Sequence, residues 1–140
     1  MSVVVIITSH APSLVNFRFE FISLLISRGH QVFAIAPNID LATKSCLESI
    51  SVSVVEIPLS RAGINPLDDL NTLLKIIQVL SRVNPDFCFS YFAKPVIYGS
   101  IAAKIAKVPN VFAMIEGLGE IFTDSGRRVE FVVASRRLIT

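Results

Sequence analysis

Five short runs of apolar residues recur along the chain, and segments with apolar residues at helical spacing lie between them. Short runs without polar interruption are typical of strands that are buried on both faces of a parallel sheet. The expected strands are Val3–Ile7, Gln31–Ala36, Val52–Ile57, Phe87–Ser90 and Val111–Ile115.

The segments between these runs predict four helices, at about residues 14–28, 40–49, 67–82 and 95–107. The first carries Phe17, Phe21 and Leu24 on one stripe and ends at Gly29, a residue that favours a C-terminal cap. The third has Pro66 in its first turn. Residues 127–140 predict a further helix, with the alternative that VEFVV within them forms a strand.

This alternation predicts one Rossmann-like, doubly wound α/β domain, with about five parallel strands in the order 3-2-1-4-5. We assign residues 1–126 to this domain. Residues 127–140 form a basic segment, which we expect to lead toward a domain absent from this chain.

Composition narrows the class of protein. Hydrophobic residues make up 52% of the chain and the mean hydropathy is +0.64, but no apolar run reaches the ~18 residues that span a bilayer. A sheet buried on both faces explains this apolarity, and so does a surface that another domain covers. Residues 127–140 hold four arginines and one glutamate, which leaves nine basic and ten acidic residues in 1–126. This balance argues against a nucleic-acid-binding body.

Chemically useful side chains follow three of the expected strands. In a parallel sheet, ligands bind at the carboxyl ends of the strands, where each loop enters the next helix. These positions are Thr8, Ser9, His10, Ser13, Asn16 and Arg18 in the first loop, Lys94 in the second, and Glu116, Gly117 and Gly119 in the third. The convergence of three loops at one edge carries more weight than any single motif.

These candidate residues have both a functional and a purely structural interpretation. His10 binds a sugar hydroxyl or acts as a base, or it makes local loop contacts only. Arg18 meets a phosphate, or it pairs with an acid. Glu116 is an acid, base or hydroxyl binder, or it makes a structural hydrogen bond. Ser13 and Asn16 contact a ligand or cap the first helix, and capping is the favoured interpretation for Ser13.

The sequence lacks the motifs that are typical of several other enzyme classes. The sequence contains no Walker loop, nucleophile elbow or spacing typical of metal ligands, and GLG at residues 117–119 is too short for a dinucleotide fingerprint. A self-contained NTPase, hydrolase or NAD enzyme is therefore disfavoured. Cys46 and Cys88 form no disulfide framework, which is consistent with a reducing cytoplasm.

Four segments, TSHAPSLVNFR, PLSRAGINPLDDL, YFAKPVIYGSIAAK and AMIEGLGEIFTDSG, together resemble the N-terminal domain of family-four glycosyltransferases of the GT-B fold. The resemblance covers residues 1–126 and is strongest to bacterial enzymes of capsule, O-antigen and other lipid-linked polysaccharide synthesis. It implies transfer of a sugar from a nucleotide-sugar donor, with retention at the anomeric carbon and without a cofactor or protein-bound metal. The N-terminal domain would hold a lipid-linked saccharide acceptor, and a C-terminal domain would bind the donor.

The resemblance also implies site residues. Substrate-binding positions carried over are Ser9, His10, Asn16, Arg18, Lys94, Tyr98, Glu116, Gly117 and Gly119, with His10 and Glu116 as the candidate catalytic residues. Phe19 and Glu120 depart from the family pattern, which has glycine and an aromatic residue at these places.

Three hypotheses follow. The first is the acceptor-side half of a polysaccharide glycosyltransferase, inactive alone and cytoplasmic. Its basic tail starts a helix toward the other domain, contacts the membrane surface, or is a solvated helix end. The second is a transferase whose donor-binding domain lies on another chain. The third is a non-catalytic, flavodoxin-like binding module, although Thr8–His10 lacks the acidic cluster that receiver-like modules carry after the first strand.

Overall fold

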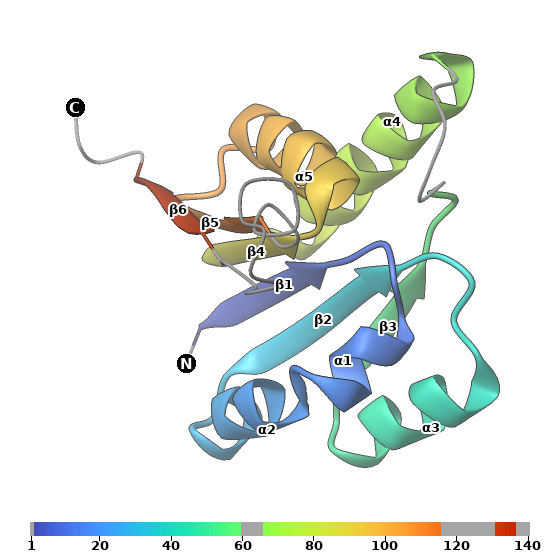
Figure 1. The fold of residues 1–140 in the computed structure, drawn as a ribbon. Helices are drawn as coiled ribbons and strands as arrows, with labels where there is room; N and C mark the ends of the chain where they lie inside the picture. The colour runs from blue at the N-terminus through green and yellow to red at the C-terminus, as the bar shows by residue number, and fades with distance from the viewer. Residues whose placement is uncertain (1, 60–65, 116–130, 137–140) are drawn as a thin grey trace, which may run out of the picture.

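A six-stranded sheet in the order β3-β2-β1-β4-β5-β6 forms the centre of the computed structural model, which describes residues 2–59, 66–115 and 131–136 (Figure 1). The first five strands run parallel and the sixth is antiparallel to β5. The strands are β1 Val3–Ile7, β2 Gln31–Ala36, β3 Ser53–Glu56, β4 Phe87–Tyr91, β5 Asn110–Ile115 and β6 Phe131–Arg136. The predicted parallel strands and their order are confirmed.

Helices cover both faces of the sheet. They are α1 Pro12–Asn16, α2 Phe19–Ser27, α3 Leu41–Ser49, α4 Pro66–Val83 and α5 Ala93–Ile105. The first three lie on one face and α4 and α5 on the other (Figure 1). Alternate residues of β1 therefore enter two cores, Val5 and Ile7 on the α4–α5 side and Val4 and Ile6 on the other. Burial on both faces explains the continuous apolar runs.

The expected first helix is two helices. Its break falls at Phe17 and Arg18, because the carbonyl oxygen of Ser13 accepts from the N–H groups of both residues, at 2.9 and 3.2 Å. The second bond closes a wider turn than an α-helical one. The α2 helix therefore starts in a new direction, and Arg18 lies at the junction rather than within a continuous helix.

The prediction of a C-terminal helix is also wrong for residues 131–136, the part of this segment that the structure describes. Residues 131–136 form a strand that pairs with β5, with Phe131 opposite Ile115 and Arg136 opposite Asn110. Its β-branched and aromatic residues favour a strand, and the outer edge of β5 supplies the hydrogen-bonding partners. The alternative strand interpretation of VEFVV is thus closer to the observed structure.

Helix α5 packs against β4 and β1 through small residues. Ala102 and Ala103 are fully buried. A Cβ atom added to Gly99 would overlap Ser90 Oγ and come within 3.2 Å of Ile7 Cδ1. A glycine is therefore required for this close approach. Within the described part of the chain, no helix is long and apolar enough to cross a membrane.

Candidate functional site

Two of the predicted loops start side by side. Strands β1 and β4 are parallel neighbours, with Ile7 opposite Ser90. The loop that begins at Thr8 and the turn that begins at Phe92 therefore leave the same edge of the sheet. This edge, at the carboxyl ends of the strands, is where ligands bind in open α/β sheets.

The first loop is held by hydrogen bonds to the main chain of His10. Its N–H donates to Thr8 Oγ1 at 3.2 Å, and its carbonyl accepts from Ser13 Oγ at 2.5 Å. Thr8, Ser9 and Ser13 are buried, whereas the imidazole of His10 is half-buried. The loop therefore has a fixed backbone and a partly accessible imidazole.

Ser13 is not the helix cap that the sequence favoured. It lies inside α1, whose N-cap residue is Ala11, and Ala11 makes no side-chain cap hydrogen bond. Ser13 Oγ lies 2.6 Å from the hydroxyl oxygen of Tyr91, in addition to its bond with His10. The serine therefore connects the first loop to the end of β4. Asn16 is the last residue of α1 and is exposed.

Tyr91 is a site residue that sequence reasoning missed. It is the last residue of β4 and only 1% exposed, and burial raises the pKa of its hydroxyl although Ser13 and Thr8 act in the opposite direction. A buried tyrosine hydroxyl needs a hydrogen-bond partner, and Ser13 provides it. The available signal was a tyrosine at the carboxyl end of an otherwise apolar strand, FCFSY.

The guanidinium of Arg18 lies over the ring of Tyr91. Its Cζ atom is 4.8 Å from the ring centre, and its Nη2 donates to Met114 Sδ at 3.1 Å. Such cation–π contacts contribute about 0.5–2 kcal/mol, depending on solvent exposure. Arg18 thus reaches from the α1–α2 junction to the ends of β4 and β5, at the edge where the sequence placed it.

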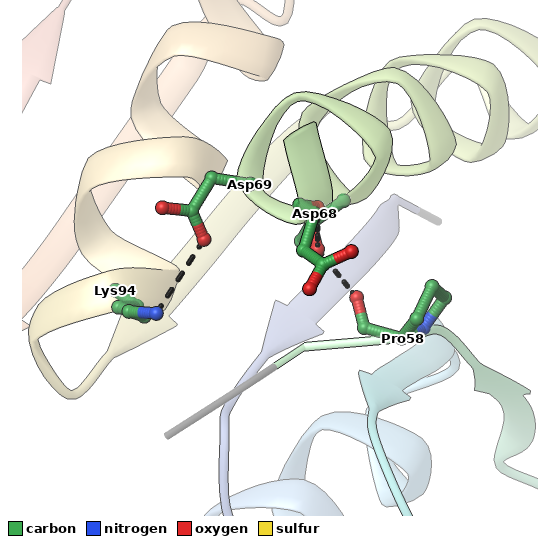
Figure 2. Close-up of polar contacts among 5 residues, drawn as sticks. Pro58, Asp68, Asp69 and Lys94 are labelled. Carbon is green, nitrogen blue, oxygen red and sulfur yellow. Dashed lines mark hydrogen bonds and ion pairs between the residues drawn. The ribbon is translucent and has the colours of Figure 1, made fainter. Parts of the chain in front are cut away.

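Lys94 and Tyr98 both interact with Asp69. Lys94 Nζ lies 3.4 Å from Asp69 Oδ1, and Figure 2 shows the two side chains pointing toward one another from α5 and α4. A hydrogen bond to the Asp69 carboxylate, followed by burial, raises the pKa of Tyr98. Lys94 and Tyr98 were both among the candidates from the sequence, whereas Asp69 was not.

The turn between β4 and α5 has an unusual backbone. Phe92 adopts φ 74° and ψ 158°, a conformation that is essentially restricted to glycine. Its ring centre lies 5.0 Å from that of Tyr91. Residues held in such conformations cluster at functional sites. The strained turn therefore supports the assignment of the candidate functional site to this edge of the sheet.

The third predicted loop, with Glu116, Gly117 and Gly119, lies outside the described residues, as does Glu120. Within residues 2–59 and 66–114, no group of three His, Cys, Asp or Glu side chains could hold a metal ion. Burial raises the pKa of Cys88 to about 12, which makes this thiol unreactive.

A parallel α/β sheet with polar side chains gathered at the carboxyl ends of its central strands defines a Rossmann-like domain with a candidate site at that edge. The family model described as "Glycosyl transferase 4-like" matches residues 5–135. The chain therefore belongs to the glycosyl transferase 4-like family, which confirms the resemblance found in the sequence.

A curated relative is N,N'-diacetylbacillosaminyl-diphospho-undecaprenol alpha-1,3-N-acetylgalactosaminyltransferase of Campylobacter jejuni. It is 37% identical over 131 residues, which cover 91% of this chain and 34% of the relative. The chain thus spans about a third of the length of this relative.

Solved structures with the same fold have diverse activities. MurG of Acinetobacter baumannii has a TM-score of 0.62 at 16% identity, over 79% of this chain and 33% of MurG. A deacetylase of teicoplanin biosynthesis has a TM-score of 0.64 at 11% identity, over 90% of this chain and 71% of the deacetylase. Because two different chemistries share the architecture, these similarities show the fold and not the activity.

Proposed function

We propose that this chain is the acceptor-binding half of a retaining glycosyltransferase that adds a sugar to a lipid-linked saccharide in capsule, O-antigen or exopolysaccharide synthesis. The observation that carries the proposal is the position of Arg18 at the sheet edge, beside the loop of His10. The family match and the name of the Campylobacter relative, a transferase acting on a diphospho-undecaprenol saccharide, give the chemical class.

Arg18 is suited to the diphosphate of such an acceptor. A guanidinium pairs well with phosphate oxygens. Its observed contact with Met114 Sδ is weak, because a thioether is a poor hydrogen-bond acceptor. A phosphate oxygen is a much stronger acceptor for this guanidinium than the thioether is.

The remaining candidates would contact the saccharide. Ser9, His10 and Asn16 offer groups that bind sugar hydroxyls, and Asp69 orients Lys94 and Tyr98 at the neighbouring loop. Glu116, Gly117 and Gly119 complete the proposed set. His10 and Glu116 are the proposed acid or base groups.

The nucleotide-sugar donor would bind to a second domain, either in the same protein or on another chain. The relative is about three times as long as the match, which supports a further domain in that protein. We propose that this chain alone binds the acceptor and does not transfer the sugar.

Peripheral membrane contact would bring the site to its lipid-linked substrate. The sequence placed this contact at the basic tail, and we assign it instead to the outer surface of α4 and α5, where Leu70, Leu74, Ile97 and Ile101 are 43–53% exposed. Residues 66–107 hold five basic and three acidic residues, whereas residues 18–50, on the other face, hold three of each. The α4–α5 side is therefore better matched to anionic lipid.

The decisive experiment measures both ligands on this chain. We expect binding of an undecaprenyl diphosphate-linked saccharide in detergent, no comparable binding of UDP-N-acetylgalactosamine, and a loss of acceptor affinity of about tenfold or more in Arg18→Ala. Arg28→Ala, an exposed arginine at the other end of α2, is the matched control. Tight binding of the nucleotide sugar without binding of the lipid-linked saccharide would reverse the assignment.

A further inference from the structure

Tyr91 contacts both parts of the proposed acceptor site. Its ring faces the guanidinium of Arg18, and its hydroxyl lies 2.6 Å from Ser13 Oγ. Ser13 in turn is bonded to the carbonyl oxygen of His10. A single side chain at the end of β4 thus joins the first loop to the arginine.

Counting protons fixes the direction of the hydrogen-bond chain. The carbonyl oxygen of His10 can only accept, so the single hydroxyl proton of Ser13 is used in that bond. The hydroxyl of Tyr91 must therefore donate to Ser13 Oγ. The resulting order is Tyr91 O–H to Ser13 O–H to His10 C=O, which needs the tyrosine protonated.

Neighbouring aromatic side chains hold the ring of Tyr91 in place. Ring centres of Phe89 and Phe92 lie 6.0 and 5.0 Å from it, and Tyr91 is almost fully buried. Arg18, in contrast, is half-buried at a helix junction. The rigid partner in this pair is the ring, so the ring sets where the guanidinium lies.

We propose that Tyr91 is a positioning residue of the acceptor site, whose ring places the guanidinium of Arg18 and whose hydroxyl, through Ser13, places the main chain of His10. This inference rests on the proposed function, because it assumes that Arg18 meets the diphosphate of the acceptor. In this inference Tyr91 acts through Arg18 and Ser13 and does not contact the substrate itself.

The test is a double-mutant cycle on this chain, with geranyl diphosphate as a soluble probe and affinity measured by calorimetry. Tyr91→Met fills the buried space without a ring and should lower the affinity about fivefold or more, by misplacing Arg18. In the Arg18→Ala background the same substitution should change the affinity by less than about twofold. Equal losses in both backgrounds would show a merely structural role and overturn the inference.

Two further variants separate the ring from the hydroxyl. Tyr91→Phe restores the ring and should recover most of the affinity lost in Tyr91→Met. It should also speed exchange of the His10 backbone amide proton, and Ser13→Ala should do the same, because each variant breaks the bonded chain. Phe87→Met removes another aromatic residue from the same strand and serves as the matched control, with affinity unchanged.

Failure of the two proposals can be told apart. If Arg18→Ala binds geranyl diphosphate as well as the parent chain, the proposed role of Arg18 is wrong. If Arg18→Ala loses affinity while Tyr91→Met does not, the proposed function stands and Tyr91 has no positioning role. Should Tyr91→Met fail to fold, the Arg18 Nε–H resonance of the parent chain provides the measurement. The inference would be contradicted if the parent chain showed no ring-current displacement of this resonance. It would also be contradicted if exchange of the His10 amide proton were unchanged in Tyr91→Phe/Ser13→Ala.

Discussion

Lys94 and Asp69 form an ion pair between the first turns of α5 and α4, in which each side chain is 16% exposed. A single pair of this kind contributes little to stability. The same carboxylate also acts on Tyr98, because it raises the pKa of that hydroxyl. Figure 2 shows Asp69 and Lys94 facing one another, so this aspartate holds the side chain of Lys94 in place.

Asp69→Asn should lower the pKa of Tyr98, because the hydrogen bond to the carboxylate is the largest cause of its raised value. A tyrosine whose folded pKa is raised stabilises the protein at pH values below about 10, and this contribution is lost as the pH rises through the folded value. Ultraviolet titration in a Tyr91→Phe background observes Tyr98 alone, since the chain has two tyrosines. An unchanged titration curve in Asp69→Asn would contradict the assignment.

Gly99→Ala should destabilise the protein by about 1–3 kcal/mol, because the new methyl group overlaps Ser90 Oγ. Urea denaturation measures the effect. Ser90→Ala removes the overlapping oxygen, so we expect the double variant to recover a large part of the loss. Simple additivity of the two substitutions would show that the close approach of α5 to β4 does not cause the destabilisation.

Asp40 should give α3 a pH-dependent stability. Its carboxylate accepts from Thr43 Oγ1 at 2.6 Å and from Thr43 N at 3.0 Å, which lowers its pKa. A lowered pKa means that this stabilisation is present above the unfolded value of about 3.9 and is lost as the pH falls through the folded value. Asp40→Asn keeps a capping oxygen but does not titrate. We expect thermal melts of the two proteins to converge in acid, and parallel melting curves at every pH would contradict this.

Ile97→Ser/Ile101→Ser should weaken binding to vesicles that contain equal parts of phosphatidylglycerol and phosphatidylcholine. Both isoleucines are exposed on α5, in a stretch from residue 87 to residue 115 without any acidic residue. Binding should also fall with added salt, because the lysines of this stretch are screened. Leu41→Ser is the matched control, since Leu41 is 78% exposed at the start of α3, on the other face. Equal loss in the control would show that the apolar contact is not specific to α5.

The strand order and the family could be predicted from the sequence because both depend on local patterns. Apolar runs such as Val3–Ile7 predict burial on both faces, and that burial is the property of a central parallel strand. The position of the loop at Thr8–Ala11 then follows from the topology. The sequence placed Lys94 in the loop before a helix, whereas α5 already begins at Ala93. Its partner Asp69 lies 25 residues away and gave no local signal.

Only the tertiary structure decided the contacts between residues that lie far apart in the sequence. Ser13 and Tyr91 are 78 positions apart, and Arg18 and Met114 are 96 apart. A sequence periodicity extends over a few turns of a helix or a few residues of a strand, so it carries no information about such pairs. The sequence by itself therefore determined which edge of the sheet holds the candidate site. The folded chain decided that Tyr91 lies at its centre, because only the pairing of β1 with β4 and β5 brings its partners together.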